Sequence, residues 1–282
     1  MIDLTVLIIT KDEEKNLEKC LQSVNSVAKR IVVVDSGSTD KTVEIAQKNG
    51  ADVFFHEFTN HASQLNWGLE NTGIDTKWIM RMDADEELTD ELQNEIRTKL
   101  PVLDDSVSGI FLKRRVYFMG KWIKHGGVYP LHVLRIFKNG SAVCEQRIMD
   151  EHFVVTDGGK EITFKYDFCD KNEKPLDWWL NKHNWYSNLE MKAYIKEQES
   201  DSNDGVKPKL FGTAVERKRW LKNVMYYKTP ILRRAHWYFI YRYFLKLGFL
   251  DGKEGLIFHF LQGYWYRFVV DAKIYEEIKN KK

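Results

Sequence analysis

The chain has 282 residues, of which 43% are hydrophobic and 30% are charged. This amount of apolar mass can bury a core, which excludes an intrinsically disordered protein. Lysine and arginine total 43 against 41 aspartate and glutamate, so the net charge of +2 gives no support to a dedicated DNA-binding protein. Aromatic residues reach 13%, which predicts a thick core or a surface that contacts sugars or a membrane.

The cysteines and the amino-terminal segment predict the compartment. Cys20, Cys144 and Cys169 form no CxxC or Cys/His cluster, so we expect buried free thiols in a reducing cytoplasm. The first apolar run, 4–9, is short and flanked by acids, which is typical of a strand and not of a signal peptide. No uncharged stretch is long enough to cross a bilayer.

Strands and helices alternate through the first hundred residues. The predicted strands are 4–9, 31–34, 52–55 and 77–82. The predicted helices are about 13–28, one capped by Thr39 or Asp40, about 61–72, and one capped by Thr89 or Asp90. This order predicts an α/β fold with a doubly wound, mainly parallel sheet. Ligands bind such sheets at the carboxyl ends of the strands, which here are Thr10 to Glu13, Asp35 and Asp83 to Asp85.

The pattern changes after residue 105. Residues 109–119, 131–138 and 162–166 are predicted strands of a mixed extension, and the chain is helical from Pro175 onward. We therefore expect a domain at 1–170, with one half at about 1–105 and a second at about 106–170. A helical carboxyl-terminal extension follows at 171–282, and its best linker is the polar segment 198–208.

Three acidic motifs follow predicted strands. Asp83 and Asp85 end an apolar strand, where two carboxylates are costly to gather unless a hard divalent cation binds them. The alternative is a solvated acidic helix cap that includes the next two glutamates. Asp35 can bind a ribose or a base edge, or form an Asx turn. The loop from Thr10 to Glu14 can instead be the acidic first turn of a helix.

The three motifs in this order (TKDEE, VVVDSGSTD and MRMDADEE) resemble the family 2 glycosyltransferases of the GT-A fold, over roughly residues 1–155. The resemblance implies that Asp35 binds the nucleotide, and that Thr10 and Glu13 belong to the first nucleotide-contacting loop. It implies that Asp83 and Asp85 bracket a nucleotide sugar, with Asp85 as the ligand of a Mn²⁺ or Mg²⁺ ion.

Further segments resemble one subgroup of that family, whose members build lipopolysaccharide core and other surface glycans. These segments are 64–66 (QLN), 120–127 (GKWIKHGG), 135–137 (RIF) and 248–252 (GFLDG). The resemblance places Gln64 in the nucleotide-sugar site. A basic residue usually follows the matching glutamine in the subgroup, whereas here it is Leu65.

The catalytic base is expected on the acceptor side, where a carboxylate takes the proton of the attacking hydroxyl. Glu151 is favoured by match to the core-building subgroup, and Asp150 is the alternative by match to the wider family. Adjacent residues on a strand point to opposite faces, so only one of them can face the sugar. A helix cap with an ion pair is a further interpretation. His152 is either a third metal ligand or a hydrogen-bonded structural histidine.

Other candidates carry positive charge or an aromatic face. Arg81 and Arg135 can hold phosphate or acceptor charge, although Arg81 lies inside a strand and can equally form a buried salt bridge with a site acid. Trp122, His125 and Tyr129 flank a Gly-Gly pair in a predicted acceptor loop. They can stack on sugar rings or anchor the loop to the core.

The carboxyl-terminal region hides a local charge surplus. Residues 207–246 contain eleven basic residues and one acid, interleaved with aromatic residues. Such helices predict peripheral contact with an anionic membrane. RNA binding and packing on the catalytic domain are the alternatives. The apolar stretch 249–268 can be core or a homodimer interface.

The leading hypothesis is an inverting, metal-dependent glycosyltransferase on the inner face of a bacterial cytoplasmic membrane. It would move sugar from a nucleotide-sugar donor, with a UDP-sugar favoured, to a saccharide or lipid-linked acceptor, and no nucleic acid partner is expected. A sugar nucleotidyltransferase is disfavoured because the loop after the first strand is acidic and lacks glycine. A membrane or RNA-binding module without catalysis is disfavoured by the intact acids at three strand ends.

Overall fold

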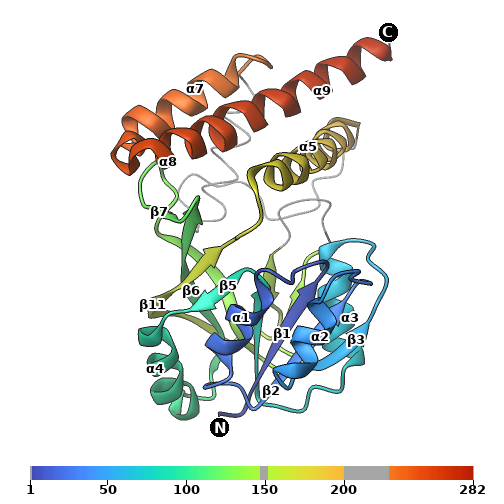
Figure 1. Ribbon diagram of the computed structural model, residues 1–282, viewed down its shortest axis with the longest axis vertical. Coiled ribbons are helices and arrows are strands. Elements are labelled where there is room, and N and C mark those ends of the chain that lie inside the picture. Colours follow the sequence, from blue (N-terminus) through green and yellow to red (C-terminus); the bar gives the residue numbers. More distant parts are fainter. Residues whose placement is uncertain (1, 147–151, 200–228, 282) are drawn as a thin grey trace. The chain divides into compact units, whose positions relative to one another are not determined.

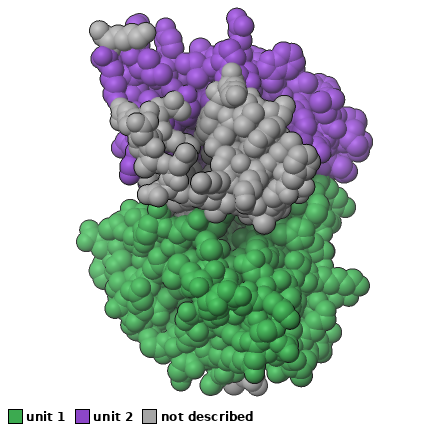
Figure 2. Space-filling view, turned by 180° about the vertical axis from the view of Figure 1, so that it is seen from behind, with its two compact units in different colours: residues 1–124, 128–174 green, residues 125–127, 175–282 purple. Residues whose placement is uncertain are grey.

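The computed structural model describes residues 2–146, 152–199 and 229–281 (Figure 1). The chain divides into two compact units, shown in different colours in Figure 2. Unit 1 comprises 1–124 and 128–174, and unit 2 comprises 125–127 and 175–282. Unit 2 thus takes in the short segment 125–127 as well as the chain from Pro175 onward. None of the helices in the described part of the chain is both long and apolar enough to cross a bilayer.

Parallel strands make up the first half of the unit 1 sheet, in the order β3-β2-β1-β4. Their bounds are β1 Leu4–Thr10, β2 Arg30–Asp35, β3 Asp52–Phe55 and β4 Trp78–Asp83. The helices that connect or follow them are α1 Leu17–Val24, α2 Thr42–Lys48, α3 His61–Asn71 and α4 Asp90–Lys99. A 3-10 turn, η1 Leu100–Val102, follows α4.

The second half of the sheet is mixed and continues in the order β8-β6-β11-β5, with β7 paired to β6. Its strands are β5 Glu86–Leu88, β6 Val107–Phe118, β7 Lys121–Ile123, β8 Leu131–Lys138 and β11 Lys160–Lys171. Because β8 is antiparallel to both β4 and β6, and β6 is parallel to β11, the longer strands β1, β4, β6 and β11 share one direction. This confirms the predicted mixed, mainly parallel sheet.

The two faces of β1 are buried against different helices, as alternation along a strand requires. Leu4, Val6 and Ile8 belong to the core cluster that contains the apolar residues of α1 and α4. Leu7 belongs to a second cluster, with residues of α3 such as Leu65. Burial on both faces explains why this segment is a continuous apolar run rather than an alternating one.

Several short elements differ from the sequence-based expectation. Residues 86–88 form β5, not a helix cap, and pair antiparallel with β11. The strand expected at 162–166 extends over 160–171, while the first helix is shorter than expected, 17–24. A separate two-stranded sheet joins β9 Ala142–Cys144 to β10 Phe153–Val155. Three-residue strands are too short to give a periodic pattern, so the sequence did not reveal them.

Unit 2 is helical, as expected. Its elements are α5 Leu176–Glu199, α7 Arg234–Ile240, the π-helical turn η3 Tyr241–Leu245, the 3-10 turn η4 Gly248–Asp251, α8 Gly252–Phe258, the π-helical turn η5 His259–Trp265 and α9 Tyr266–Asn280. Buried residues of α9, such as Val270 and Ile274, pack with residues of α5. Arg234 donates from Nε to Asp271 Oδ1 over 2.7 Å, so a buried ion pair joins α7 to α9.

The segment 125–127 is held within unit 2 by polar contacts and close packing. His125 bonds to Asp251 through its backbone nitrogen, at 2.8 Å, and its ring Nδ1, at 2.7 Å. The ring of His259 lies against Gly126, where any Cβ would overlap it, and is fully buried. Burial and the nearby charge of Arg242 lower the pKa of His259 to about 4, although Asp251 acts in the opposite direction. His259 is therefore neutral in the folded protein at pH 7.

Acid should weaken unit 2 for this reason. The folded-state pKa of His259, about 4, lies below its ordinary value of 6.5, so the unfolded chain binds more protons between these values. Stability is full above about pH 6.5 and is lost as the pH falls toward about 4. Burial also lowers the pKa of His183 to about 4, which adds to the same trend.

We expect His259→Met, which fills the space without a titratable group, to reduce this acid sensitivity but not abolish it. Urea unfolding measured at several pH values between 7 and 4.5 tests this. His132→Gln, at an exposed position, is the control and should leave the change of unfolding free energy with pH as in the parent protein. An identical pH dependence in His259→Met and the parent protein would contradict the buried neutral imidazole.

Candidate functional site

Polar side chains gather at the carboxyl edge of the parallel half of the sheet. Thr10 pairs in register with Asp35, and Ile9 pairs with Asp83, so the ends of β1, β2 and β4 lie side by side. The three motifs singled out in the sequence therefore meet at one edge, as the strand order requires.

Asp35 is almost fully buried and organises its own loop. Its Oδ2 accepts hydrogen bonds from the backbone nitrogens of Gly37 and Ser38, both at 2.8 Å. Its Oδ1 accepts from Thr10 Oγ1 at 3.0 Å and from the Ser38 hydroxyl. The Asx-turn interpretation thus describes its local contacts, and the direct role of Asp35 in nucleotide binding stays a prediction.

Glu13 is held by a residue that the sequence did not single out. Lys174, just after β11, donates to Glu13 Oε1 at 2.6 Å, and Asn16 donates to Oε2 at 2.7 Å. Burial raises the pKa of Glu13, while these two donors act in the opposite direction. The bond between Lys174 and Glu13 links the loop after β1 to the end of β11, 161 residues away in the sequence.

Gln64 is fully buried at the start of α3 and connects two loops. Its Nε2 donates to Ser36 Oγ at 2.9 Å, and its Oε1 lies 2.6 Å from Nδ1 of His56. Asn60 caps this helix by accepting from the Ser63 nitrogen at 2.8 Å. The contact with Ser36 brings Gln64 to the loop that follows β2.

Two arginines neutralise Asp83. Arg81 Nη2 lies 2.6 Å from Asp83 Oδ1, and Arg135 Nη2 lies 3.4 Å from Oδ2. Arg81 therefore forms the salt bridge with a site acid that the sequence offered as an alternative to phosphate binding. The structure also joins Arg135, the other candidate for holding phosphate or acceptor charge, to the acids at the end of β4.

Glu86 is the partner that the sequence missed. It is buried on β5, bonds to Arg135 and accepts from the Asp83 nitrogen at 2.9 Å. Burial and the nearby charge of Asp83 raise the pKa of Glu86 well above its usual range. The solvated-cap interpretation is therefore wrong for Glu86. Its burial could only have been found by recognising a three-residue strand.

Asp85 differs from its neighbours in having no cation beside it among the described residues. Its side chain accepts one hydrogen bond, from the neutral amide of Asn172 at 2.8 Å. A half-buried carboxylate with oxygen lone pairs to spare fits a hard divalent cation. Among the described residues, no group of three or more His, Cys, Asp or Glu side chains could hold a metal ion. The structure therefore does not bring His152 together with Asp83 and Asp85 as a set of ligands.

The remaining candidates belong to the predicted acceptor side. Trp122 and Tyr129 meet edge to face with centroids 5.1 Å apart, and the Tyr129 hydroxyl donates to Asp167 at 3.1 Å. His125 belongs to unit 2. The acceptor roles of these three residues stay predictions. Asp150 and Glu151, the two candidates for the base, lie outside the described residues.

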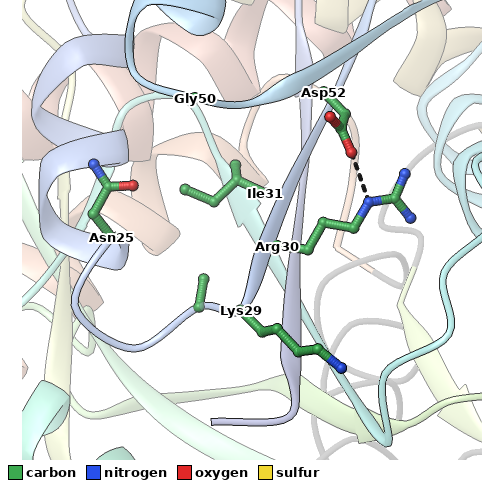
Figure 3. A pocket seen from close by; sticks show the side chains of 7 residues that line it. Asn25, Lys29, Arg30, Ile31, Gly50 and Asp52 are labelled. Atoms are coloured by element: carbon green, nitrogen blue, oxygen red, sulfur yellow. Dashed lines mark hydrogen bonds and ion pairs between the residues drawn. The ribbon is translucent and has the colours of Figure 1, made fainter. Parts of the chain in front are cut away.

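A surface cavity of about 310 Å³ lies elsewhere in unit 1. Its lining includes Arg30 and Ile31 at the start of β2 and Asp52 at the start of β3 (Figure 3). The amino ends of these strands lie at the opposite edge of the sheet from Asp35, so this cavity is not the candidate site. Among its lining residues, Arg30 and Asp52 form an ion pair of 2.7 Å (Figure 3).

Comparisons with known proteins agree with this geometry. Residues 5–139 match the glycosyl transferase family 2 profile. An uncharacterized glycosyltransferase of Rickettsia bellii is 42% identical over 93 residues, which cover 33% of this chain but only 31% of that protein. The lipopolysaccharide core biosynthesis glycosyltransferase LpsC of Rhizobium meliloti is 27% identical over 98% of this chain and 93% of its own length.

Among solved structures, the mannosyltransferase PcManGT of Pyrobaculum calidifontis, in complex with GDP-Man and Mn²⁺, superposes with a TM-score of 0.54. The match covers 96% of this chain and 86% of that chain at 15% identity, which supports a shared fold. The chain has the GT-A fold, and its residues 5–139 form a glycosyl transferase family 2 domain. This identification favours the leading hypothesis over the nucleotidyltransferase and the non-catalytic binding module.

The pair of Arg135 and Glu86 can be tested by its effect on stability. Arg135→Met leaves the buried carboxyl group of Glu86 without its partner, so we expect unfolding to become easier by about 3 kcal/mol. Adding Glu86→Leu removes the unpaired polar group and should recover most of that loss. Urea unfolding of the two single variants and the double variant measures the coupling. Additive losses in the double variant would show that the two side chains do not interact.

Proposed function

We propose that this chain is an inverting, metal-dependent glycosyltransferase that moves a sugar from a nucleotide-sugar donor to a saccharide or lipid-linked acceptor. The observation that carries the proposal is the acidic edge, where Asp83 and Glu86 have arginine partners while Asp85 has none among the described residues. A donor diphosphate cannot lie beside an uncompensated carboxylate without a cation between them, because the like charges repel.

Asp85 would hold a Mn²⁺ or Mg²⁺ ion, with Asn172 orienting its carboxylate. When bound, the ion supplies positive charge that stabilises the departing diphosphate. The protein's own residues fix the position of this carboxylate before the ion binds. Asn172 occupies Oδ2, while Arg81 and Arg135 keep Asp83 paired.

The nucleotide would lie along the loops that follow β1 and β2, close to Thr10, Asp35 and Gln64. These loops are preorganised, because Asp12 and Ser38 also bond across them: the Asp12 nitrogen donates to Ser38 Oγ at 2.8 Å. Preorganised loops lose little entropy on binding, which favours affinity for the donor. A UDP-sugar is the favoured donor, and a GDP-sugar is the rival, since PcManGT was solved with GDP-Man.

The acceptor side is proposed from resemblance. Trp122, His125 and Tyr129 would contact the acceptor, and Glu151, or alternatively Asp150, would take the proton of its attacking hydroxyl. The likeness to LpsC supports a role in bacterial surface glycan biosynthesis of the lipopolysaccharide or capsule type. We place the enzyme in the cytoplasm, peripherally on the inner face of the membrane.

Asp85→Asn tests the metal role. The parent protein should gain thermal stability from one of UDP-, GDP-, CMP- or dTDP-sugars when Mn²⁺ is present, by RT ln(1 + [L]/Kd). Asp85→Asn should lose that gain and at least about 100-fold of the transfer rate, since the charge that recruits the cation is gone.

Glu87→Gln is the matched control, because Glu87 is the acid two residues on and pairs with Lys171 at 2.7 Å. It should keep both the stabilisation and the transfer. Failure of all four donors to stabilise the parent protein would refute the proposed donor class. A fully active Asp85→Asn would refute the metal role.

The two candidates for the base can be separated by isosteric variants. Glu151→Gln should lower the transfer rate by about 10²–10⁴-fold, because general-base catalysis is lost, while donor binding in the thermal-shift assay stays intact. Asp150→Asn should have a much smaller effect. The reverse order of the two effects would assign the base to Asp150, and small effects of both would exclude this pair.

A further inference from the structure

One turn of unit 2 exposes a row of large apolar side chains. Over 244–250, called here the apolar turn, Leu245 is 71% exposed and Leu250 is 55% exposed. The other exposed apolar residues of the turn are Phe244, Leu247 and Phe249. The surfaces of soluble proteins carry scattered apolar residues, but a contiguous group of this kind marks an interaction surface.

The apolar turn continues into neighbouring aromatic rings. Tyr243 contacts Phe244 and Phe249 with ring centroids 5.1 Å and 6.3 Å apart. Exposed Trp237 and Tyr241 lie on the preceding helical segment. Tyr243 therefore packs against Phe244 and Phe249, near the two ends of the turn.

The backbone of the turn gives a second indication. Leu247 has φ of 60° and lies in the left-handed region, which glycine or asparagine adopts more easily than leucine. Its side chain is exposed, so it gains little burial in return. The fold alone does not account for a leucine here, whereas contact with an apolar phase does.

The surrounding charge favours an anionic partner. Between 229 and 254 the acids are Asp251, which is buried and bonded to His125, and Glu254, which is partly buried. The exposed charged residues of that stretch are all basic: Arg233, Lys246 and Lys253. Apolar and aromatic side chains flanked by basic residues match the interface of a bilayer that contains anionic lipid.

The back of the turn is bonded to the predicted acceptor loop. The backbone nitrogen of Gly126 donates to the Lys246 oxygen at 2.8 Å, and Arg242 Nε donates to the Gly126 oxygen at 3.0 Å. With the two bonds between His125 and Asp251, the turn and residues 125–126 form one hydrogen-bonded body.

We infer that the apolar turn inserts into the interfacial region of an anionic bilayer and thereby presents residues 125–126 to a lipid-linked saccharide at its surface. The second part rests on the proposed function, whereas insertion of the turn does not. Aromatic and leucine side chains enter the boundary of the acyl chains, while Lys246 and Lys253 contact lipid phosphates.

Vesicle flotation of the full chain tests the inference, with phosphatidylcholine vesicles compared with vesicles that contain about one third phosphatidylglycerol. The protein should float with the anionic vesicles, and Leu245→Ser/Leu250→Ser should weaken binding roughly tenfold or more, as two apolar side chains leave the interface. Lys246→Gln/Lys253→Gln should weaken binding and reduce its salt dependence.

Tyr275→Ser/Ile278→Ser is the matched control, since these residues are 52% and 39% exposed on α9 of the same unit. It should bind vesicles as the parent does. Donor binding by thermal shift should be equal in all of these proteins, so a failed donor assay refutes the proposed function separately from the membrane contact.

Several results would overturn the inference. One is flotation that is absent in the parent, or unchanged in Leu245→Ser/Leu250→Ser. Another is a lowered unfolding midpoint in that variant, which would show that the turn is packed against protein. If the parent protein binds no vesicles, and Leu245→Ser/Leu250→Ser loses a dimer or RNA binding that the parent has, the surface belongs to that partner instead.

Discussion

The buried contact between Arg135 and Glu86 is the interaction on which the acidic edge depends. Three acids lie within residues 83–86, and gathering them at the end of a buried strand is costly without compensation. Arg135 comes from β8 and reaches Glu86 on β5 and Asp83 at the end of β4, so one guanidinium joins three strands. With Arg81 also on Asp83, the remaining negative charge is concentrated on Asp85.

The edge is assembled from segments that are far apart in the sequence. The parallel strands bring Thr10, Asp35 and Asp83 together through their register. The end of β11 then closes the edge from the other side, with Asn172 on Asp85 and Lys174 on Glu13. Groups that are already held in place can bind a charged ligand without rearranging.

Sequence predicted the parts that depend on local pattern. Continuous apolar runs such as 31–34 gave the buried strands, and the rule for strand ends located the edge without any motif. It could not show that Glu86 is buried, because β5 has only three residues. Nor could it pair Asn172 with Asp85, 87 residues away, or place Arg135 beside Asp83 and Glu86, since only the sheet order creates these contacts.

We propose that Asp85, which has no Lys or Arg partner among the described residues, binds a divalent metal ion. Electron paramagnetic resonance of Mn²⁺, titrated with the protein in the presence of UDP or GDP, tests this directly and needs no acceptor. We predict that the free Mn²⁺ signal falls with the parent protein and with Glu87→Gln but persists with Asp85→Asn. Equal binding of Mn²⁺ by Asp85→Asn and the parent protein would contradict the account.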